Sequence, residues 1–577
     1  MHAATPDEHI ENPQVAPIPT VLHRRAIMNE KTVRQGRHIA WIIILAAVGL
    51  YAVFQVRFLI DPWSSWIHPE TASSDAVLRF YFETPNSWES YLTVITTGTG
   101  TDTNPARLRL FNNAVEFFDA YWRRPLVAEF GFLPALTNAS TLIYFLLCPL
   151  FAVVVARQLI GRSIFGAIAI VLAVNAFLTS VGYESASIFV FHPGKKIVIF
   201  LSLLQLTVFL RYIRRPHIAL VALVGACQFV LGLTDEIGLV SGLLFSCAAA
   251  GYAFLVTGRY LLEVALLAAF GVATAMAYGY NYATHWNEVF VHKLPVLDRT
   301  FGQLLLSMWP SSGLDLAVAH VAGAFSLLYG SRIAGLLLAF SVATTCVLAA
   351  VALVAQRSPD EVLADTRGGF GRVASSYIFL MALVFLVVNS VTAVMLLRFG
   401  GSLSLSEYNY YYASNLSVFA LLITCSTFRV TNLAAQSKQV ISKLAGRAAQ
   451  LSLAVALALA IAANVQEMPR VNEAFGLLHS NPFLYGVINR LAQDRLHSAS
   501  SATERQVLDI PRCSKDAMTA RFDALLDQLN ASSRIRNDFL YLTTQLSQDD
   551  RYIRAVMAMM LRKPPPIDVV VAPAGQC

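Results

Sequence analysis

Long runs of apolar residues divide this chain, and short polar connections separate most of them. Eleven runs approach the roughly 20 residues that a helix needs to cross a bilayer. Because lipid offers a bare backbone no hydrogen bonds, each run is expected to be an α-helix. The pattern therefore predicts an all-α polytopic membrane protein with about eleven transmembrane helices. The predicted spans are 38–60, 137–155, 163–181, 197–210, 217–233, 237–256, 260–280, 333–355, 376–397, 417–428 and 449–465.

Four polar segments lie before, between or after these spans. A basic tail, 1–37, precedes the transmembrane domain of 38–465. Within that domain, two long connections, 61–136 and 281–332, stand out from the short ones. The last segment, 466–577, loses the apolar pattern and forms a domain of its own.

The C-terminal segment shows helical periodicity. Met518, Phe522 and Leu525 recur at three- and four-residue spacing, and three prolines at 564–566 end the helical pattern. A short strand-like run, 567–571, follows them. The pattern predicts a small, mostly helical domain.

Composition and charge agree with a membrane protein. The chain is 56% hydrophobic and only 14% charged, with a mean hydropathy of +0.55, whereas soluble domains carry about 25% charged residues. The net charge of +7 could suggest nucleic acid. However, the basic residues lie in short connections beside the apolar runs, which is typical of membrane orientation. Nucleic acid is therefore not an expected partner.

The distribution of basic residues predicts the orientation. With a cytoplasmic N-terminus, 18 Lys and Arg residues fall on inner connections, and the short outer connections hold only Lys195, Lys196 and Arg398. Both long connections are then outside. An odd number of spans also makes 466–577 extracytoplasmic. No small-residue cleavage site follows the first run, so it is expected to remain as an anchor. The layout indicates a multi-pass protein of a bacterial inner membrane.

The cysteines divide between the two environments. Cys513 and Cys577 lie in the C-terminal segment, where an oxidising compartment would join them in a disulfide. The alternative is two free thiols. The other five lie in apolar runs and are expected to be packing residues.

The connection 61–136 contains the first group of candidate catalytic residues. Asp61 follows the first span directly, and Asp75 and Glu83 come next, interleaved with aromatic residues such as Trp63. A carboxylate at the membrane edge can act as general base towards an acceptor hydroxyl, or can hold a divalent cation. Aromatic rings can stack on sugars. The alternative is that the rings form an interfacial belt and most of the acids are solvated.

Later in the same connection, 112–124 has an amphipathic pattern. Val115, Phe118 and Tyr121 fall on one helical face. The pattern predicts a helix that lies on the outer leaflet and presents this apolar face to it.

Asp235 and Glu236 stand side by side between two apolar runs, at the predicted outer surface. Carboxylates at such a depth are costly, and this favours a functional role such as binding a metal ion. The alternative is a tight polar turn that reaches water.

Two further groups are candidates for substrate binding. Lys195, Lys196 and Arg398 are cations on the outer side, where a lipid-linked phosphate would hold them; pairing of the lysines with Asp235 or Glu236 is the competing account. Tyr408 and Tyr411, in the run Glu407–Tyr412, could line a sugar or isoprenoid site, or could belong to the interfacial belt.

Taken together, the layout resembles that of the polytopic GT-C superfamily of glycosyltransferases. The resemblance rests on many membrane helices, a long first outer loop with acids, and an outer C-terminal domain. It implies a polyprenyl-phosphate-linked sugar donor and a catalytic acid after the first span. Asp61 and then Asp75 occupy the matching positions here, without the paired acids that are common in that superfamily, so Asp61, Asp75 and Glu83 all stay candidates.

The expected function is transfer of a sugar from a polyprenyl-phosphate-linked donor to a glycan, lipid or protein acceptor at the outer face. A divalent cation is a candidate cofactor. Three alternatives stay open. The protein could be a transporter or flippase of lipid-linked glycans, an outer-face glycan polymerase or ligase, or a membrane assembly protein.

Overall fold

A computed structural model gives the fold. It describes residues 41–53, 87–89, 92, 108–115, 118–119, 139–160, 164–180, 193–234, 236–256, 260–284, 330–355, 376–381, 409–437, 439–480, 507–510, 524, 527 and 568–571. Within these ranges the chain is helical, apart from turns and one pair of short strands.

Six of the described helices are long and apolar enough to cross a membrane. Four shorter apolar helices accompany them, among them Trp41–Val53, which precedes the labelled helices. These ten correspond to ten of the eleven predicted spans. The remaining one, 376–397, is described only over residues 376–381, which are helical. The fold is thus a helical protein with six candidate membrane spans.

The helix bounds follow the predicted spans closely in the middle of the chain. The helices are α6 (Ala139–Ile160), α7 (Ile164–Leu178), α9 (Pro193–Arg214), α10 (Ile218–Thr234), α11 (Glu236–Val256), α12 (Tyr260–Thr284), α16 (Arg332–Ala355), α19 (Asn409–Ala435) and α20 (Val440–Ser480).

Three helices extend furthest beyond the apolar runs that predicted them. Helix α9 begins at Pro193 instead of 197, and α19 covers Asn409–Ala435 instead of 417–428. Helix α20 continues past 465 to Ser480. Each extension takes in polar residues, because a helix continues wherever its backbone can hydrogen-bond internally, whereas hydropathy marks only the lipid-facing part.

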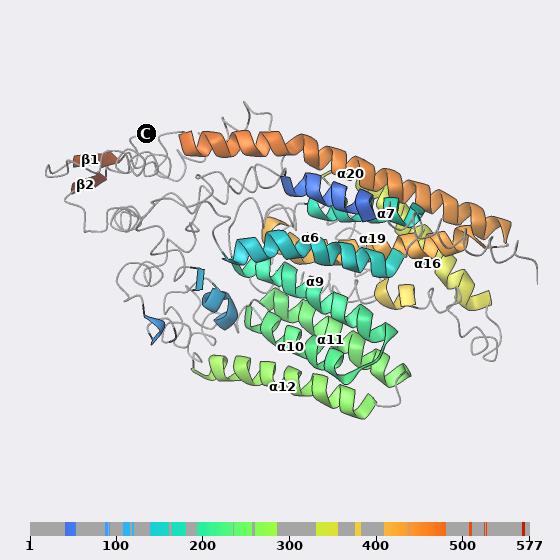
Figure 1. Ribbon diagram of the computed structural model, residues 1–577, viewed down its shortest axis with the longest axis horizontal. Helices are drawn as coiled ribbons and strands as arrows, with labels where there is room; N and C mark the ends of the chain where they lie inside the picture. The colour runs from blue at the N-terminus through green and yellow to red at the C-terminus, as the bar shows by residue number, and fades with distance from the viewer. Residues whose placement is uncertain are drawn as a thin grey trace, which may run out of the picture.

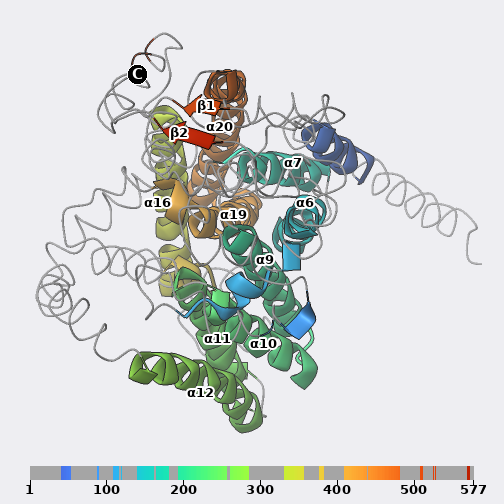
Figure 2. The same cartoon turned by 90° about the vertical axis from the view of Figure 1, so that its left-hand side faces the viewer.

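The helices run roughly alongside one another in a bundle (Figure 1). Helix α9 lies near the middle and packs against α6, α10, α11 and α19. Helices α12 and α20 lie at opposite edges in both views (Figure 2). Residues 108–115 and 118–119 lie at the same end of the bundle as the strands, where α9 begins (Figure 1).

Polar side chains of α9 tie it to its neighbours at three depths. At its start, the Nζ of Lys196 donates to the Oγ1 of Thr141 on α6. Midway, the Nε2 of Gln205 donates to the carbonyl of Val224 on α10 at 3.0 Å and to that of Gly242 on α11 at 3.1 Å.

At the other end of α9, the hydroxyl of Tyr212 donates to the Oε2 of Glu263 on α12 at 2.6 Å. The guanidinium of Arg214 donates to the carbonyl of Gln158 on α6. Helix α9 therefore has a polar contact with each of four helices, and these contacts set its depth against them.

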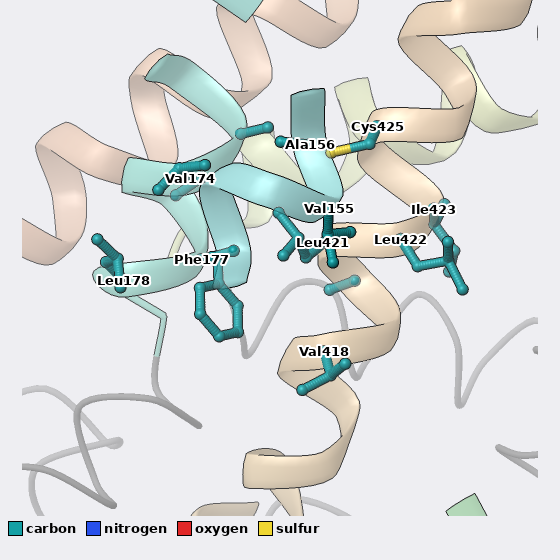
Figure 3. Close-up of a cluster of buried hydrophobic side chains, with 14 of the residues drawn as sticks. Val155, Ala156, Val174, Phe177, Leu178, Val418, Leu421, Leu422, Ile423 and Cys425 are labelled. Atoms are coloured by element: carbon teal, nitrogen blue, oxygen red, sulfur yellow. The ribbon is translucent and has the colours of Figure 1, made fainter. Parts of the chain in front are cut away.

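The largest buried cluster lies between α6, α7, α9, α19 and α20. Val155 of α6, Phe177 of α7 and Leu421 of α19 meet there (Figure 3). Phe245 of α11 stacks on Phe419 of α19, with ring centroids 5.5 Å apart. Since lipid is as apolar as these side chains, close packing stabilises the bundle, and transfer out of water does not.

The start of the first helix, Trp41–Val53, contacts the last turns of α6, and its other end contacts the end of α7. Trp41 lies under the guanidinium of Arg157, 4.1 Å from the ring centroid, near the end of α6. The hydroxyl of Tyr51 donates to the carbonyl of Leu178, the last residue of α7. This pairing of ends is the one expected if successive spans alternate in direction.

Glycines bring α10, α11 and α12 into close contact. A Cβ on Gly238 of α11 would lie 2.5 Å from the carbonyl oxygen of Leu231 on α10, and one on Gly242 would lie 3.0 Å from the Cα of Gln228. Gly232 of α10 packs in the same way against Thr274 of α12. Gly238 and Gly242 form a GxxxG motif, which permits this approach of two helix backbones.

Two glycines of α11 lie in different surroundings, so replacing each with alanine is expected to change stability to a different extent. Gly238→Ala is expected to lower the free energy of unfolding by about 1–3 kcal/mol, because the methyl group would force α10 and α11 apart. Gly251→Ala on the same helix is the matched control, since a Cβ there meets nothing within 4 Å. Thermal unfolding in detergent measures both. Equal unfolding temperatures for the two variants would contradict this packing.

Two short strands pair in parallel near the end of the chain. Strand β1 (Val507–Ile510) lies beside β2 (Asp568–Val571), with Ile510 opposite Val571. The predicted strand-like run at 567–571 is thus confirmed, and its partner was not predicted. Both strands lie beyond the end of α20 (Figure 1).

The predicted disulfide would join residues that follow these two strands in the chain. Cys513 follows Ile510 by three residues and Cys577 follows Val571 by six. Both cysteines lie outside the described residues. We expect mass spectrometry without reduction to find a peptide that joins Cys513 to Cys577. Complete alkylation of both thiols in protein taken directly from membranes would refute the disulfide and the extracytoplasmic position of this segment.

Candidate functional site

The lysine pair predicted to bind phosphate lies in the first turn of α9 and is buried. Lys195 is 7% exposed and Lys196 is 0% exposed. The sequence had placed both in a connection before the fourth span, whereas the structure includes them in the helix. No acidic residue lies in this first turn, so two positive side chains adjoin the positive end of the helix dipole.

Helix α6 begins next to this turn and holds one of the two ammonium groups. The Nζ of Lys196 donates to the Oγ1 of Thr141 at 2.6 Å. The neighbouring Ser140 donates its backbone N–H to the Oδ1 of Asp119 at 3.2 Å and its hydroxyl to the Oδ2. Asp119, which is 4% exposed, thus caps the start of α6 with a buried carboxylate.

Residues 108–115 of the first long connection cover the start of α9. A Cβ on Gly194 would lie 2.8 Å from the Cγ of Asn112 and closer still to its Oδ1. Phe111 and Val115 pack on buried Ile197 and Leu201 of α9. Only glycine at 194 lets the Asn112 side chain approach the helix so closely. The first long connection is therefore part of this site.

The predicted amphipathic helix at 112–124 is only partly right. The described residues 110–115 and 118–119 are helical, but Val115 packs on α9 instead of facing the outer leaflet. Phe118 is 53% exposed, as a side chain that faces the leaflet would be, whereas the polar Asp119 next to it is buried. Asp119 is buried because its carboxylate accepts hydrogen bonds from Ser140 at the start of α6.

The junction of α10 and α11 lies beside the same turn of α9. A Cβ on Gly238 would lie 3.3 Å from the Cγ2 of Val198, three residues after Lys195. Asp235 lies outside the described residues, and Glu236 is described only as the first residue of α11. Their predicted pairing with the lysines, and their predicted role as metal ligands, stay predictions. The backbone nevertheless brings this acidic junction to the lysine pair.

The other predicted site residues are not placed. The candidate acids, the aromatic residue of the first loop and two outer residues lie outside the described residues. These are Asp61, Asp75, Glu83, Trp63, Arg398 and Tyr408. Tyr411 belongs to α19, and its side chain is outside the described part. Among the described residues, no group of three His, Cys, Asp or Glu side chains could hold a metal ion.

Comparisons with protein-family models, with curated proteins and with solved structures find no match to this chain. The chemistry of the site therefore has to be argued from its own residues. Lys195, Lys196 and the N–H groups of the first turn of α9 are hydrogen-bond donors of the kind that bind phosphate and carboxylate. We name this group, together with Thr141, Ser140, Asp119 and Asn112, the lysine site.

Four residues of the lysine site are not among the sequence candidates, namely Asn112, Asp119, Ser140 and Thr141. Each has the pattern of an ordinary polar residue of a loop or helix end. A local signal existed for Thr141, since Ser140 and Thr141 begin an apolar run, where hydroxyl residues commonly stand at a helix start. No local signal in the sequence connects Ser140 or Thr141 with Lys196, which is 55 positions from Thr141.

The contact between Thr141 and Lys196 predicts a stability effect. Thr141→Val keeps the shape of the side chain and removes the oxygen that accepts from a buried ammonium group. We expect the free energy of unfolding to fall by about 1–2 kcal/mol. Thr207→Val is the control, since its hydroxyl bonds only to the carbonyl of Leu203 within α9. Chemical or thermal unfolding that affects both variants equally would show that Thr141 does not hold Lys196.

Proposed function

We propose that this chain is a membrane glycosyltransferase that moves a sugar from a polyprenyl-phosphate-linked donor to an acceptor at the outer face. The observation that carries the proposal is the buried pair Lys195 and Lys196 in the first turn of α9. Like charges on neighbouring residues repel, and the helix dipole disfavours them further. A bound phosphate would offset both effects.

The position of the lysine site supports a lipid-linked donor. It lies at the end of helices long and apolar enough to cross a membrane, where a polyprenyl phosphate presents its headgroup. The connection that contains Asp61, Asp75 and Glu83 also contributes residues 108–115 to the site. The candidate acids thus belong to the same connection as residues that pack on the start of α9.

The proposed reaction follows from these positions. A carboxylate of the first connection, either Asp61, Asp75 or Glu83, takes the proton of the acceptor hydroxyl. The acceptor oxygen forms a bond to the anomeric carbon, and the bond from that carbon to the phosphate oxygen breaks. The electron pair leaves with the polyprenyl phosphate. Lys195 and Lys196 then stabilise the additional negative charge on the phosphate.

Transport or flipping of lipid-linked glycans is a second candidate, favoured by a different observation. In the middle of the bundle, the Oε1 atoms of Gln205 and Gln228 and the hydroxyls of Ser202 and Ser246 are buried and find no hydrogen-bond partner among the described residues. Polar side chains within a membrane often line a substrate or ion path. The competing account is that both glutamines only clamp helices together, through their amide N–H groups.

The test measures release of polyprenyl phosphate from polyprenyl-phosphate hexoses and pentoses by the purified protein in nanodiscs. Lys195→Gln and Lys196→Gln should each raise KM for the donor by about 10- to 100-fold, as expected for loss of a charge-assisted bond. At least one of Asp61→Ala, Asp75→Ala and Glu83→Ala should abolish turnover while donor binding persists. Lys443→Gln, an exposed lysine at the other end of the bundle, is the control for charge.

Two results would overturn the proposal that the protein is a glycosyltransferase. One is full release by all three acid variants. The other is an unchanged KM in both lysine variants. A second assay uses the protein in sealed vesicles with a labelled lipid-linked glycan. Movement of the glycan across the membrane that stops when ion gradients collapse, without release of polyprenyl phosphate, would show that the protein is a transporter.

A further inference from the structure

Helices α6, α9 and α19 pack pairwise. All three finish at the end of the bundle opposite the lysine site (Figure 1). Each carries an arginine at or near this end, namely Arg157, Arg214 and Arg429. By the distribution of basic residues this end faces the cytoplasm. We name these three residues the arginine triad.

The contacts of the triad hold two arginines in place. The guanidinium of Arg157 lies over the ring of Trp41, a residue type that prefers the membrane interface. The guanidinium of Arg214 donates to the carbonyl of Gln158, next to Arg157 in α6. This bond joins α9 to α6 and keeps two positive charges on neighbouring helices.

Arg429 is the unusual member. It lies within α19, six residues before the helix ends, and α19 packs against α9, whose last residue Arg214 acts on it as a like charge. Its side chain is exposed, and no hydrogen-bond or ion-pair partner for it is found among the described residues. The described acid at this end is Glu263, which accepts from Tyr212.

The need to orient the chain in the membrane does not explain why Arg429 lies inside its helix. Lys443 and Arg447 of α20 give the same topological signal from exposed positions. Arg429 instead lies about 9 Å from the end of its helix, at 1.5 Å per residue, where an unpaired charge beside a second one is costly. A long arginine side chain at this depth reaches towards the headgroup layer.

We propose that the arginine triad binds the headgroup of an anionic phospholipid from the cytoplasmic leaflet. A phosphate placed between Arg214 and Arg429 would relieve their repulsion and accept hydrogen bonds from both planar guanidinium groups. Basic sites between membrane helices on the cytoplasmic side bind acidic headgroups in this way. The acyl chains would lie along the lipid-facing surface of α19 and its neighbours.

The test compares lipid binding by variants that lose equal charge. The detergent-purified protein is titrated with phosphatidylglycerol or phosphatidylcholine and followed by native mass spectrometry. Arg214→Gln/Arg429→Gln should weaken binding of phosphatidylglycerol by about 30-fold, equivalent to about 2 kcal/mol at 1.4 kcal/mol per tenfold change. Lys443→Gln/Arg447→Gln removes two charges from the same end and should weaken it by less than about threefold.

Arg429→Gln alone keeps the test valid if the double variant does not fold, because it leaves the bond from Arg214 to Gln158 intact. Thermal unfolding in millimolar inorganic phosphate distinguishes the two sources of the anion. Stabilisation by phosphatidylglycerol but not by inorganic phosphate supports the lipid site. Equal losses in the two double variants, equal binding of phosphatidylcholine, or full stabilisation by inorganic phosphate would overturn it.

Discussion

A polar group inside a bundle of apolar helices has to find its partner on another helix, since lipid supplies none. Helix α9 carries this constraint along its whole length. Lys196, Gln205 and Tyr212 lie at successive depths and bond to α6, to α10 and α11, and to α12. Each bond is modest in energy, but together they allow only one depth and one rotation of α9. The other helices are arranged around that choice.

The glycines of α10 and α11 make this arrangement possible. Gln205 can reach carbonyls on both helices only because Gly238 and Gly242 let their backbones approach each other. The same closeness brings the junction of α10 and α11 to the first turn of α9. The glycine contacts in the middle of the bundle thus determine which residues meet at the end where α9 begins.

The two ends of the bundle carry positive charge in different electrostatic settings. Arg214 is the last residue of α9, where the helix dipole favours a cation, and it donates to the carbonyl at the end of α6. Lys195 and Lys196 lie at the first turn of α9, where the dipole disfavours them, and they are buried. A cation at the helix end that favours it tells little about function, whereas two buried cations at the end that disfavours them are candidates for binding an anion. This contrast is why the lysine site supports the proposed function, and why Arg429, away from its helix end, supports a lipid site.

The pattern of apolar and polar residues was enough to place ten helices and to predict one strand, because crossing a bilayer requires a long apolar run whatever the neighbours are. It also singled out Lys195 and Lys196, which break the distribution of basic residues. It could not show that they are buried in a helix, that Asp119 is buried at the start of α6, or that Thr141 meets Lys196. Those outcomes depend on which helix ends come together, and this is decided by interhelical hydrogen bonds and glycine contacts between residues far apart in the chain. Such contacts leave no periodic trace in the sequence, so only the tertiary structure decided them.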